Sequence, residues 1–430
     1  MPTVPGTQVV PGSRFHVEDS IDEVSLDIAD GRHLHVAWTL SIRDSTRGSG
    51  LRWEVWYQRL DTSENRWTEP IRVGPGELGR LRVIADGPLL HIVTARYLTH
   101  YLSNDGGETW GESVTQKKRK IIANTFDLIR TSRGPLLAYL AADRGARATE
   151  PGASVGVWVM RLTQHGYSPA KRIADFAGPH SGLIDPRLLA DGDTLSLFYS
   201  IAQRSRGLGP VNSRRSRIET RGRLFTCLSR DAGEHWGSPT EIGPLTTPGA
   251  SQSGSTAPGI ITELDVLHLG PRWVVLFNSS ALYSIHSTEL GSWGPCARIA
   301  GPPKAGYRTK SPAAAAADDK GLVAWIDTRF VRKVSALEAL ARGAPPSEAP
   351  EWANNDVLAV PGSALLDDPT AVLNIRPLRL THELSYASSL AAVTNGNRVH
   401  LVWGGRERVG RGLQSAMRPP VLFHAAIEAQ

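Results

Sequence analysis

The sequence predicts an all-β fold, a single β-propeller of four-stranded antiparallel blades that covers residues 1–430. A unit of short strand, polar turn and apolar strand recurs seven times along the chain. An eight-residue turn pattern, Ser-x-Asp-x-Gly-x-x-Trp, occurs twice. The 42 glycines and 29 prolines agree with this fold class, because all-β proteins with many hairpins need turn residues.

The recurring unit sets the number of blades. The seven copies of its first two strands and their turn span 25–38, 83–93, 127–140, 187–199, 266–277, 313–325 and 390–403. Gly31 and Gly396 mark the turn in the first and last copies, which gives about 61 residues per unit. Seven units predict seven blades, and six blades is the alternative if one unit is a decoration.

The last unit lacks a fourth strand. The N-terminal segment Gln8–Gly12 resembles Ile71–Pro75, the fourth strand of the first unit. We therefore expect an N-terminal strand to complete the last blade and close the ring, which removes a free sheet edge. Two stretches interrupt the period, an arginine-rich polar insertion at about 203–222 and a long connection at about 363–386. Loops of this length are usually functional or mobile. The alanine-rich stretch 333–350 can hold a helical turn.

Composition excludes several classes of protein. The net charge is +6 and the pI is near 9.4, which suits an anionic ligand but lacks the clustered excess of a dedicated nucleic-acid binder. Two cysteines, Cys227 and Cys296, form neither a disulfide framework nor a metal motif. No nucleotide-binding, calcium-loop or redox motif occurs, so we expect no cofactor. No apolar stretch of about 18 residues occurs, so no membrane span is expected. No signal peptide is recognisable, which predicts a cytoplasmic protein as written, or a secreted one if the chain is trimmed.

The two turn motifs have a local physical explanation. A serine and an aspartate can bind the backbone of a tight turn, a glycine allows a conformation that other residues resist, and the tryptophan packs nearby. The defining residues are Ser103, Asp105, Gly107 and Trp110 in the first motif, and Ser229, Asp231, Gly233 and Trp236 in the second. We interpret all eight as structural. The segment 287–293 is a degenerate third copy.

This pattern is the Asp-box of sialidases and related BNR-repeat propellers, and the chain resembles that superfamily over essentially its whole length. The resemblance implies that the Asp-boxes lie on the face opposite the active site. It also implies an arginine trio that binds the substrate carboxylate, together with a tyrosine nucleophile paired with a glutamate and an aspartic acid/base. The sialidases have six blades, and their Arg-Ile-Pro element has no unambiguous match here.

Propeller geometry places the strand-two-to-three loops and the links between blades around one mouth of the channel. These segments are rich in arginine, which suits a planar anion such as a carboxylate, although a solvated basic rim is the alternative. The candidate substrate-binding residues are Arg80, Arg308, Arg329 and Arg406.

Candidates for proton transfer and nucleophilic attack precede or begin first strands. They are Asp185 and His180 before the fourth unit, Glu383 and Tyr386 before the seventh, and Tyr307 before the sixth. An aspartic acid used as a proton donor would need burial to raise its pKa. Asp185 precedes a proline and can instead form an Asx turn, and Tyr386 can instead pack between blades.

These observations favour an enzyme that binds an anionic small molecule or glycan at the arginine-rich mouth, with hydrolysis of an acidic glycoside as the expected reaction. Two alternatives remain open. One is a lectin-like or scaffold propeller without turnover, since the fold does not fix the function. The other is a non-hydrolytic enzyme that acts on a small molecule. The oligomeric state is not predicted.

Overall fold

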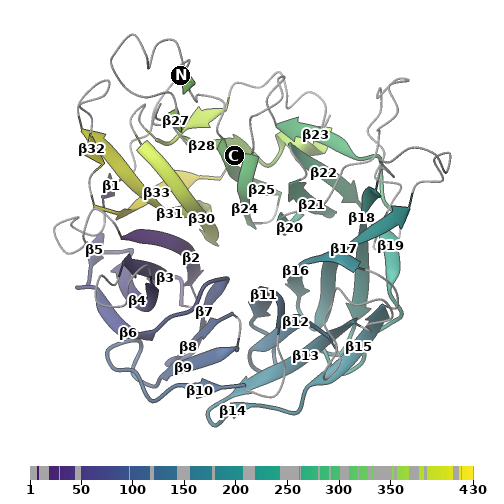
Figure 1. Ribbon diagram of the computed structural model, residues 1–430, viewed down its shortest axis with the longest axis horizontal. Helices are drawn as coiled ribbons and strands as arrows, with labels where there is room; N and C mark the ends of the chain where they lie inside the picture. The colour runs from purple at the N-terminus through teal and green to yellow at the C-terminus, as the bar shows by residue number, and fades with distance from the viewer. Residues whose placement is uncertain are drawn as a thin grey trace.

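The chain folds as a seven-bladed β-propeller (Figure 1). The computed structural model describes residues 7–8, 19–28, 30–43, 50–95, 97–116, 121–142, 155–176, 180–206, 218–242, 261, 263–278, 281–289, 292–300, 309–317, 319–327, 332–333, 351–352, 356–367, 377–381, 385–409, 416–417 and 419–429. The predicted all-β class and the seven antiparallel blades are confirmed, and with them the propeller fold that the resemblance implies.

Each blade follows the chain from the channel outward. Blade 1 comprises β2 (Ser20–Ile28), β3 (His33–Arg43), β4 (Leu51–Asp61) and an outer strand in two pieces, β5 (Arg66–Trp67) and β6 (Ile71–Pro75). Blade 2 comprises β7 (Leu81–Asp86), β8 (Leu89–Thr94), β9 (Thr99–Ser103) and β10 (Val114–Thr115). Blade 3 comprises β11 (Ile121–Ile129), β12 (Leu136–Ala142), β13 (Val155–Thr163), β14 (Gly166–Tyr167) and β15 (Lys171–Phe176).

The next two blades are plain four-stranded sheets. Blade 4 comprises β16 (His180–Asp191), β17 (Thr194–Arg206), β18 (Ile218–Ser229) and β19 (Thr240–Ile242). Blade 5 comprises β20 (Glu263–Leu269), β21 (Arg272–Asn278), β22 (Leu282–Ser287) and β23 (Ala297–Ala300). Strands β17 and β18 pair as far as Arg206 and Ile218, so paired strand occupies both ends of the stretch 203–222 that was expected to be a loop insertion.

The last two blades hold the remaining strands. Blade 6 comprises β24 (Thr309–Ala317), β25 (Lys320–Asp327), β28 (Asp356–Pro361) and β29 (Leu378–Arg379). Blade 7 comprises β30 (Ser385–Asn395), β31 (Arg398–Val409), β33 (Val421–Glu428), β1 (Thr7–Gln8) and β32 (Ala416–Met417), which pairs with β31. A separate ribbon joins β26 (Arg332–Lys333) and β27 (Glu351–Trp352).

Two further expectations concern the connections. The stretch 363–386 is not only a link, because it contains a one-turn helix, α2 (Ala364–Asp367), and the fourth strand of blade 6. Strand β1 pairs with the outer side of β33, through Thr7 opposite His424 and Gln8 opposite Phe423. Residues 9–12, which the sequence assigned to a closing strand, lie outside the described residues, so closure by that segment stays a prediction. The helical turn expected in 333–350 also lies outside them, apart from Lys333 in β26.

The hydrophobic core lies between the blades. Seven clusters of buried side chains occur in the described part of the chain, and each joins two neighbouring blades. One of them packs Trp38 of β3 and Leu40 against Val402 and Leu422, so blade 1 and blade 7 share a core as the other neighbours do. Alternation along each strand sends apolar side chains to both faces, because every sheet is covered on both sides.

The two Ser-x-Asp-x-Gly-x-x-Trp turns join third to fourth strands, in blades 2 and 4. In the first turn the Gly107 N–H donates to Ser103 Oγ at 2.8 Å, and Ser103 Oγ donates to Asp105 Oδ1 at 2.7 Å. Asp105 Oδ1 also accepts the Thr109 N–H at 2.9 Å. Thr109 and the other donors hold the pKa of the Asp105 carboxyl well below its usual range. The side chains thus bind the turn backbone, as the sequence predicts.

The second turn repeats this geometry. Ser229 Oγ accepts the Gly233 N–H at 2.9 Å, and Asp231 Oδ1 accepts the His235 N–H at 2.8 Å. The φ angles of Gly107 and Gly233 are 95° and 94°, a region that favours glycine. The matching conformations explain why the two motifs have the same spacing.

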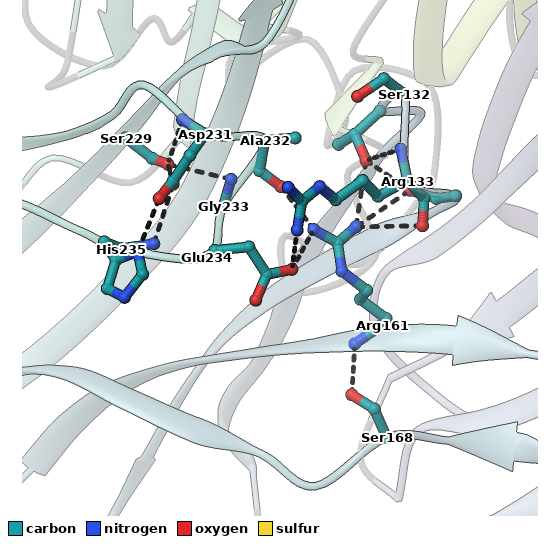
Figure 2. Close-up of polar contacts among 12 residues, drawn as sticks. Ser132, Arg133, Arg161, Ser168, Ser229, Asp231, Ala232, Gly233, Glu234 and His235 are labelled. Carbon is teal, nitrogen blue, oxygen red and sulfur yellow. Dashed lines mark hydrogen bonds and ion pairs between the residues drawn. The ribbon is translucent and has the colours of Figure 1, made fainter.

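An arginine of the preceding blade holds each turn. Arg161 of β13 donates through Nη2 to the Ala232 carbonyl at 2.5 Å and reaches Glu234 Oε1 at 3.2 Å (Figure 2). Its Nη1 donates to Thr131 Oγ1 at 3.0 Å, so one side chain contacts both blade 3 and blade 4. We refer to Arg161 with Ala232 and Glu234 as the inter-blade clamp. It stabilises the side of the propeller on which the second turn motif lies.

Candidate active site

The seven first strands enclose a central channel (Figure 1), which holds a cavity of about 600 Å³. Its lining is strongly charged, which is rare inside a protein unless the charges are paired or bind a ligand. The charged residues of its described lining are Glu23, Asp27, Asp127, Glu263, Asp265, Arg80, Arg82, Arg130 and Arg187.

Two aspartates of the lining bind the inner edge of the next blade. Asp127 Oδ2 accepts the Leu188 N–H at 2.8 Å, and Asp265 Oδ2 accepts the Ala314 N–H at 2.8 Å. The first strand of a blade has no neighbour on its channel side, so some of its N–H groups need other acceptors. The two carboxylates satisfy this need from blades 3 and 5.

The second oxygen of each aspartate faces an arginine of the preceding blade. Asp127 Oδ1 lies 2.8 Å from Arg82 Nε, and Asp265 Oδ1 lies 3.4 Å from Arg187 Nε. Each arginine is the first residue of the sequence Arg-x-x-Ala-Asp-Gly, in which both x positions are apolar. The two arginines occupy equivalent places in blades 2 and 4. Arginine and aspartate therefore alternate along the channel wall from blade 2 to blade 5, and we call these four residues the alternating layer: Arg82, Asp127, Arg187 and Asp265. The N–O distances of its two ion pairs differ by 0.6 Å.

Blade 1 follows the same plan with a smaller side chain. Ser25 Oγ accepts the Val83 N–H at 3.0 Å, in the place that the two aspartates take in blades 3 and 5. Asp27, further along the strand, accepts the Ala85 N–H at 2.7 Å and binds Arg130 Nη2 at 2.6 Å through its Oδ2. Burial raises the pKa of the Asp27 carboxyl, while Arg130 lowers it.

Asp265 has a protonation equilibrium suited to proton transfer. Burial raises the pKa of its carboxyl group to about 7, against the opposing effects of the Ala314 N–H and of the Arg82 guanidinium, and the Asp127 carboxylate raises it further. A carboxyl group with a pKa near the operating pH can both donate and accept a proton. Asp265 is therefore the described residue of the channel best suited to act as a general acid.

Glu263 is the second carboxyl group of the same strand. It lies two residues before Asp265 and on the same face of β20, so their Cα atoms are about 7 Å apart. Its Oε2 accepts the Ser311 N–H and lies 3.3 Å from Asn278 Nδ2. Burial raises the pKa of Glu263, and these two donors lower it. Ser311 has a φ of 49°, a strained conformation of the kind that concentrates at functional sites.

The mouth of the channel also carries two arginines near one glutamate. Glu23 Oε1 lies 3.9 Å from both Arg80 Nε and Arg82 Nη1. The Arg80 side chain is only 10% exposed, and its backbone carbonyl accepts the Ala95 N–H at 2.8 Å, which anchors the residue just before β7. A guanidinium group that is held rigidly and largely shielded from water binds carboxylates well.

The structure places two of the four predicted substrate-binding arginines. Arg80 lines the cavity, as expected for a residue at the channel mouth. Arg406 of β31 donates through Nη2 to the Asp19 carbonyl and thereby joins blade 7 to the start of blade 1. Arg308 and Arg329 lie outside the described residues.

The predicted catalytic residues are only partly visible. His180 and Asp185 belong to β16 and Tyr386 to β30, so all three are in first strands, but their side chains lie outside the described part of the structure. Glu383 and Tyr307 lie outside it altogether. Their assignment stays a prediction.

Comparison with known proteins gives a fold-level likeness. No family model matches the chain, and no curated protein matches it. A protein of unknown function from Dyadobacter fermentans is 12% identical, over 100% of this chain and 99% of that chain, with a TM-score of 0.49. The Penicillium chrysogenum α-L-arabinanase is 12% identical, over 100% of this chain and 99% of that chain, with a TM-score of 0.44. The NanB sialidase of Streptococcus pneumoniae is 11% identical, over 99% of this chain and 71% of that chain, with a TM-score of 0.43.

Sequence reasoning missed Glu263 and Asp265. It searched the loops and strand starts, whereas both residues lie within a first strand that was recognised only from Val266 onward. A signal was available, because Glu-Leu-Asp-Val alternates acidic and apolar residues in a strand whose one face lines the channel. The same alternation places Ser25 and Asp27 in blade 1.

The described lining of the channel is mixed in charge, and many of the arginine-rich segments predicted at the mouth lie outside the described residues. Five acidic residues stand beside four arginines in its described lining, because the inner strand edges need acceptors for their N–H groups. Within the described residues, no group of three or more histidine, cysteine, aspartate or glutamate side chains could hold a metal ion. Cys227 and Cys296 are buried and unbonded to each other. No helix in the described ranges is long and apolar enough to cross a membrane.

Proposed function

We propose that this propeller is a glycoside hydrolase that acts on an acidic sugar at the mouth of the central channel. The observation that carries the proposal is the pair of half-buried carboxyl groups, Glu263 and Asp265, in a cavity that Arg80 and Arg82 also line. Two carboxyl groups are the usual catalytic pair of glycoside hydrolases. The cavity of about 600 Å³ has the volume of a typical small-ligand site.

Asp265 is the proposed general acid. Its protonated carboxyl group donates the proton to the glycosidic oxygen as the bond from that oxygen to the anomeric carbon breaks. The pKa of about 7 keeps a useful fraction of the group protonated at neutral pH. The Ala314 N–H holds its Oδ2, and its Oδ1 lies 3.4 Å from Arg187 Nε.

Glu263 is the proposed general base. Its carboxylate takes a proton from a water molecule, whose oxygen then bonds to the anomeric carbon. The Cα atoms of the two residues lie about 7 Å apart along the strand, and inverting enzymes need a water molecule between their two carboxyl groups. We propose inversion, with a free acidic sugar and an alcohol as products.

Arg80 supports an acidic substrate. Its guanidinium group lies at the mouth, beside Glu23 at a distance longer than a direct hydrogen bond. A sugar carboxylate can form a bidentate pair with a guanidinium group. Arg308 and Arg329 remain proposed partners of the same carboxylate, and Asp185, Tyr386, Glu383, Tyr307 and His180 remain proposed contributors at the strand starts.

The test is turnover of acidic-sugar glycosides with an unactivated alcohol as the leaving group. Asp265→Asn should lower kcat by about 100- to 10,000-fold, the usual worth of a general acid. The matched control is Asp193→Asn, at an exposed aspartate outside the channel. Asp193 Oδ1 accepts a hydrogen bond from Ser132 Oγ at 2.5 Å, on the side of the propeller that carries the turn motifs. Equal rates for Asp265→Asn and wild type would contradict the proposal.

A propeller without turnover is the second candidate, and one observation favours it. Both Asp127 and Asp265 have a structural task, since each binds the edge of the next blade. If charged residues serve only to join blades, the channel binds acidic sugars without chemistry. Saturable binding of the glycoside by wild type, with no product, would support this reading.

A further inference from the structure

The two ion pairs of the alternating layer join the same atoms, an arginine Nε and an aspartate Oδ1, but differ in distance. Arg82 binds Asp127 at a hydrogen-bonding distance of 2.8 Å, whereas Arg187 stands 3.4 Å from Asp265. Arg187 is buried, with 7% of its surface exposed, and its Nη1 donates to the Pro186 carbonyl at 3.3 Å. The looser pair belongs to the carboxyl group that we propose as the proton donor.

The neighbours of Asp265 differ from those of Asp127 on one side. Toward the preceding blade each aspartate has an arginine. Toward the following blade Asp127 accepts the N–H of Leu188, the residue after Arg187, whereas Asp265 accepts the N–H of Ala314 in the uncharged segment Ser311–Ala314. Blade 7 adds only uncharged residues to the described lining, at 389–392 and 394.

The remaining charged groups of the cavity come from the other blades. Glu263 precedes Asp265 on its own strand, Glu23 and Asp27 line the wall from blade 1, and Arg130 is bound to Asp27 at 2.6 Å. Arg82 and Asp127 act on Asp265 across the channel in opposite directions. Arg187 is therefore the cation with the closest described contact to Asp265.

We infer that Arg187 is a positioning residue, which holds Asp265 Oδ1 toward the cavity while the Ala314 N–H holds Oδ2. This inference rests on the proposed function for its consequence in catalysis, but not for its test. The guanidinium group fixes the carboxyl plane from one side and the backbone amide fixes it from the other. A contact of 3.4 Å is too long for a full hydrogen bond, so it opposes protonation of the carboxyl group less than a close pair would.

The inference is tested by the titration of Asp265 itself. The protein is labelled with carbon-13 at the side-chain carboxyl of aspartate, and the Asp265 signal is assigned from its loss in Asp265→Asn. In Arg187→Gln the midpoint should rise by about 1 pH unit or more, because a nearby cation favours the charged form. The control is Arg223→Gln. Arg223 belongs to the same blade as Arg187 but binds Glu241 at 2.8 Å on the outer strands, so its loss should leave the titration midpoint of Asp265 unchanged.

Arg187→Lys is the second variant, for use if the glutamine variant does not fold. Its ammonium keeps the charge but not the planar contact, so the midpoint should rise by less than in Arg187→Gln. An unmoved midpoint in whichever of the two folds would overturn the inference. If the wild type turns over a glycoside, the high-pH limb of kcat/KM should move upward with the midpoint. Absence of turnover would contradict the proposed function alone, since the titration still reports on Arg187.

Discussion

Arg161 Nη2 and Glu234 Oε1 lie 3.2 Å apart across the boundary between blades 3 and 4 (Figure 2). Blades 1 and 2 repeat the relationship. Arg59 Nη1 donates to the Gly106 carbonyl at 3.0 Å, and its Nη2 lies 3.6 Å from Glu108 Oε1. The propeller thus uses one device twice to hold the turn of one blade with an arginine of the blade before it.

The inter-blade clamp should stabilise the fold. Arg161→Ala removes hydrogen bonds to the Ala232 carbonyl and to Thr131, so the free energy of unfolding should fall by about 2 kcal/mol. Urea unfolding followed by tryptophan fluorescence measures the change. The control is Arg66→Ala, whose side chain is 78% exposed in its ion pair with Glu64 and should cost no more than about 0.5 kcal/mol. Equal losses in the two variants would argue against a clamp.

The glycine of the first turn should resist substitution for two reasons. A Cβ at Gly107 would overlap the ring of Tyr57, and φ is 95°. Gly134 has a similar φ of 91°, but a Cβ there meets nothing within 4 Å. Gly134→Ala therefore measures backbone strain alone, about 1–3 kcal/mol, and Gly107→Ala should cost about 1–3 kcal/mol more through overpacking. The prediction fails if the two variants unfold at the same urea concentration.

Buried histidine pairs should make the fold sensitive to acid. His91 Nδ1 lies 3.0 Å from His100 Nε2, and burial lowers their pKa values to about 4 and about 3. The folded state therefore holds both rings neutral, while the unfolded state protonates them below about pH 6.5. Stability is unaffected above that pH and falls as the pH drops toward the folded pKa values.

The contribution of the pair to the pH dependence of stability can be isolated by replacing one of the two histidines. Between pH 7.5 and pH 5, each histidine should cost about 2 kcal/mol of unfolding free energy. His100→Phe should remove about that much of the pH dependence, measured by urea unfolding at the two pH values. The same dependence in wild type and variant would show that the pair does not titrate as described. His400 and His424, also 3.0 Å apart, form a second pair with lowered pKa values.

The two acid candidates of the channel can be separated directly. Asp185 belongs to β16, the first strand of blade 4, and Asp265 belongs to β20, the first strand of blade 5. If Asp265 is the proton donor, Asp265→Asn should lose about 100- to 10,000-fold in kcat on an unactivated glycoside, and Asp185→Asn should lose less. Steady-state kinetics of both variants, with circular dichroism to check folding, make the comparison. A larger loss in Asp185→Asn would transfer the role to that residue.

The fold was predictable because its signals are local. The turn residues Ser103, Asp105 and Gly107 contact one another within five positions, and the repeated strand pairs are hairpins. Local patterns of this kind survive in a single sequence. The seven blades follow from counting them.

The channel was less predictable because its contacts join distant residues. Asp27 binds Arg130 across 103 positions of sequence, and Asp265 binds the backbone of the following blade at Ala314. A backbone N–H carries no residue type, so no motif marks it. The burial that raises the pKa of Asp265 arises only when all the blades surround it. Arg80 could be predicted because the link before a first strand lies at the mouth in any propeller.

The central claim is that Asp265 donates a proton to the leaving group, and the pH dependence of kcat/KM tests it most directly. Wild type on an unactivated acidic-sugar glycoside should lose activity as the pH rises through about 7, because the pKa of Asp265 is raised to about 7 and its proton is then lost. Asp265→Asn should regain most of its rate on a glycoside with a phenolic leaving group, which needs no protonation, and should show no fall near pH 7. A wild-type profile that stays flat from pH 6 to 9, or an Asp265→Asn profile that keeps the fall, would contradict the claim.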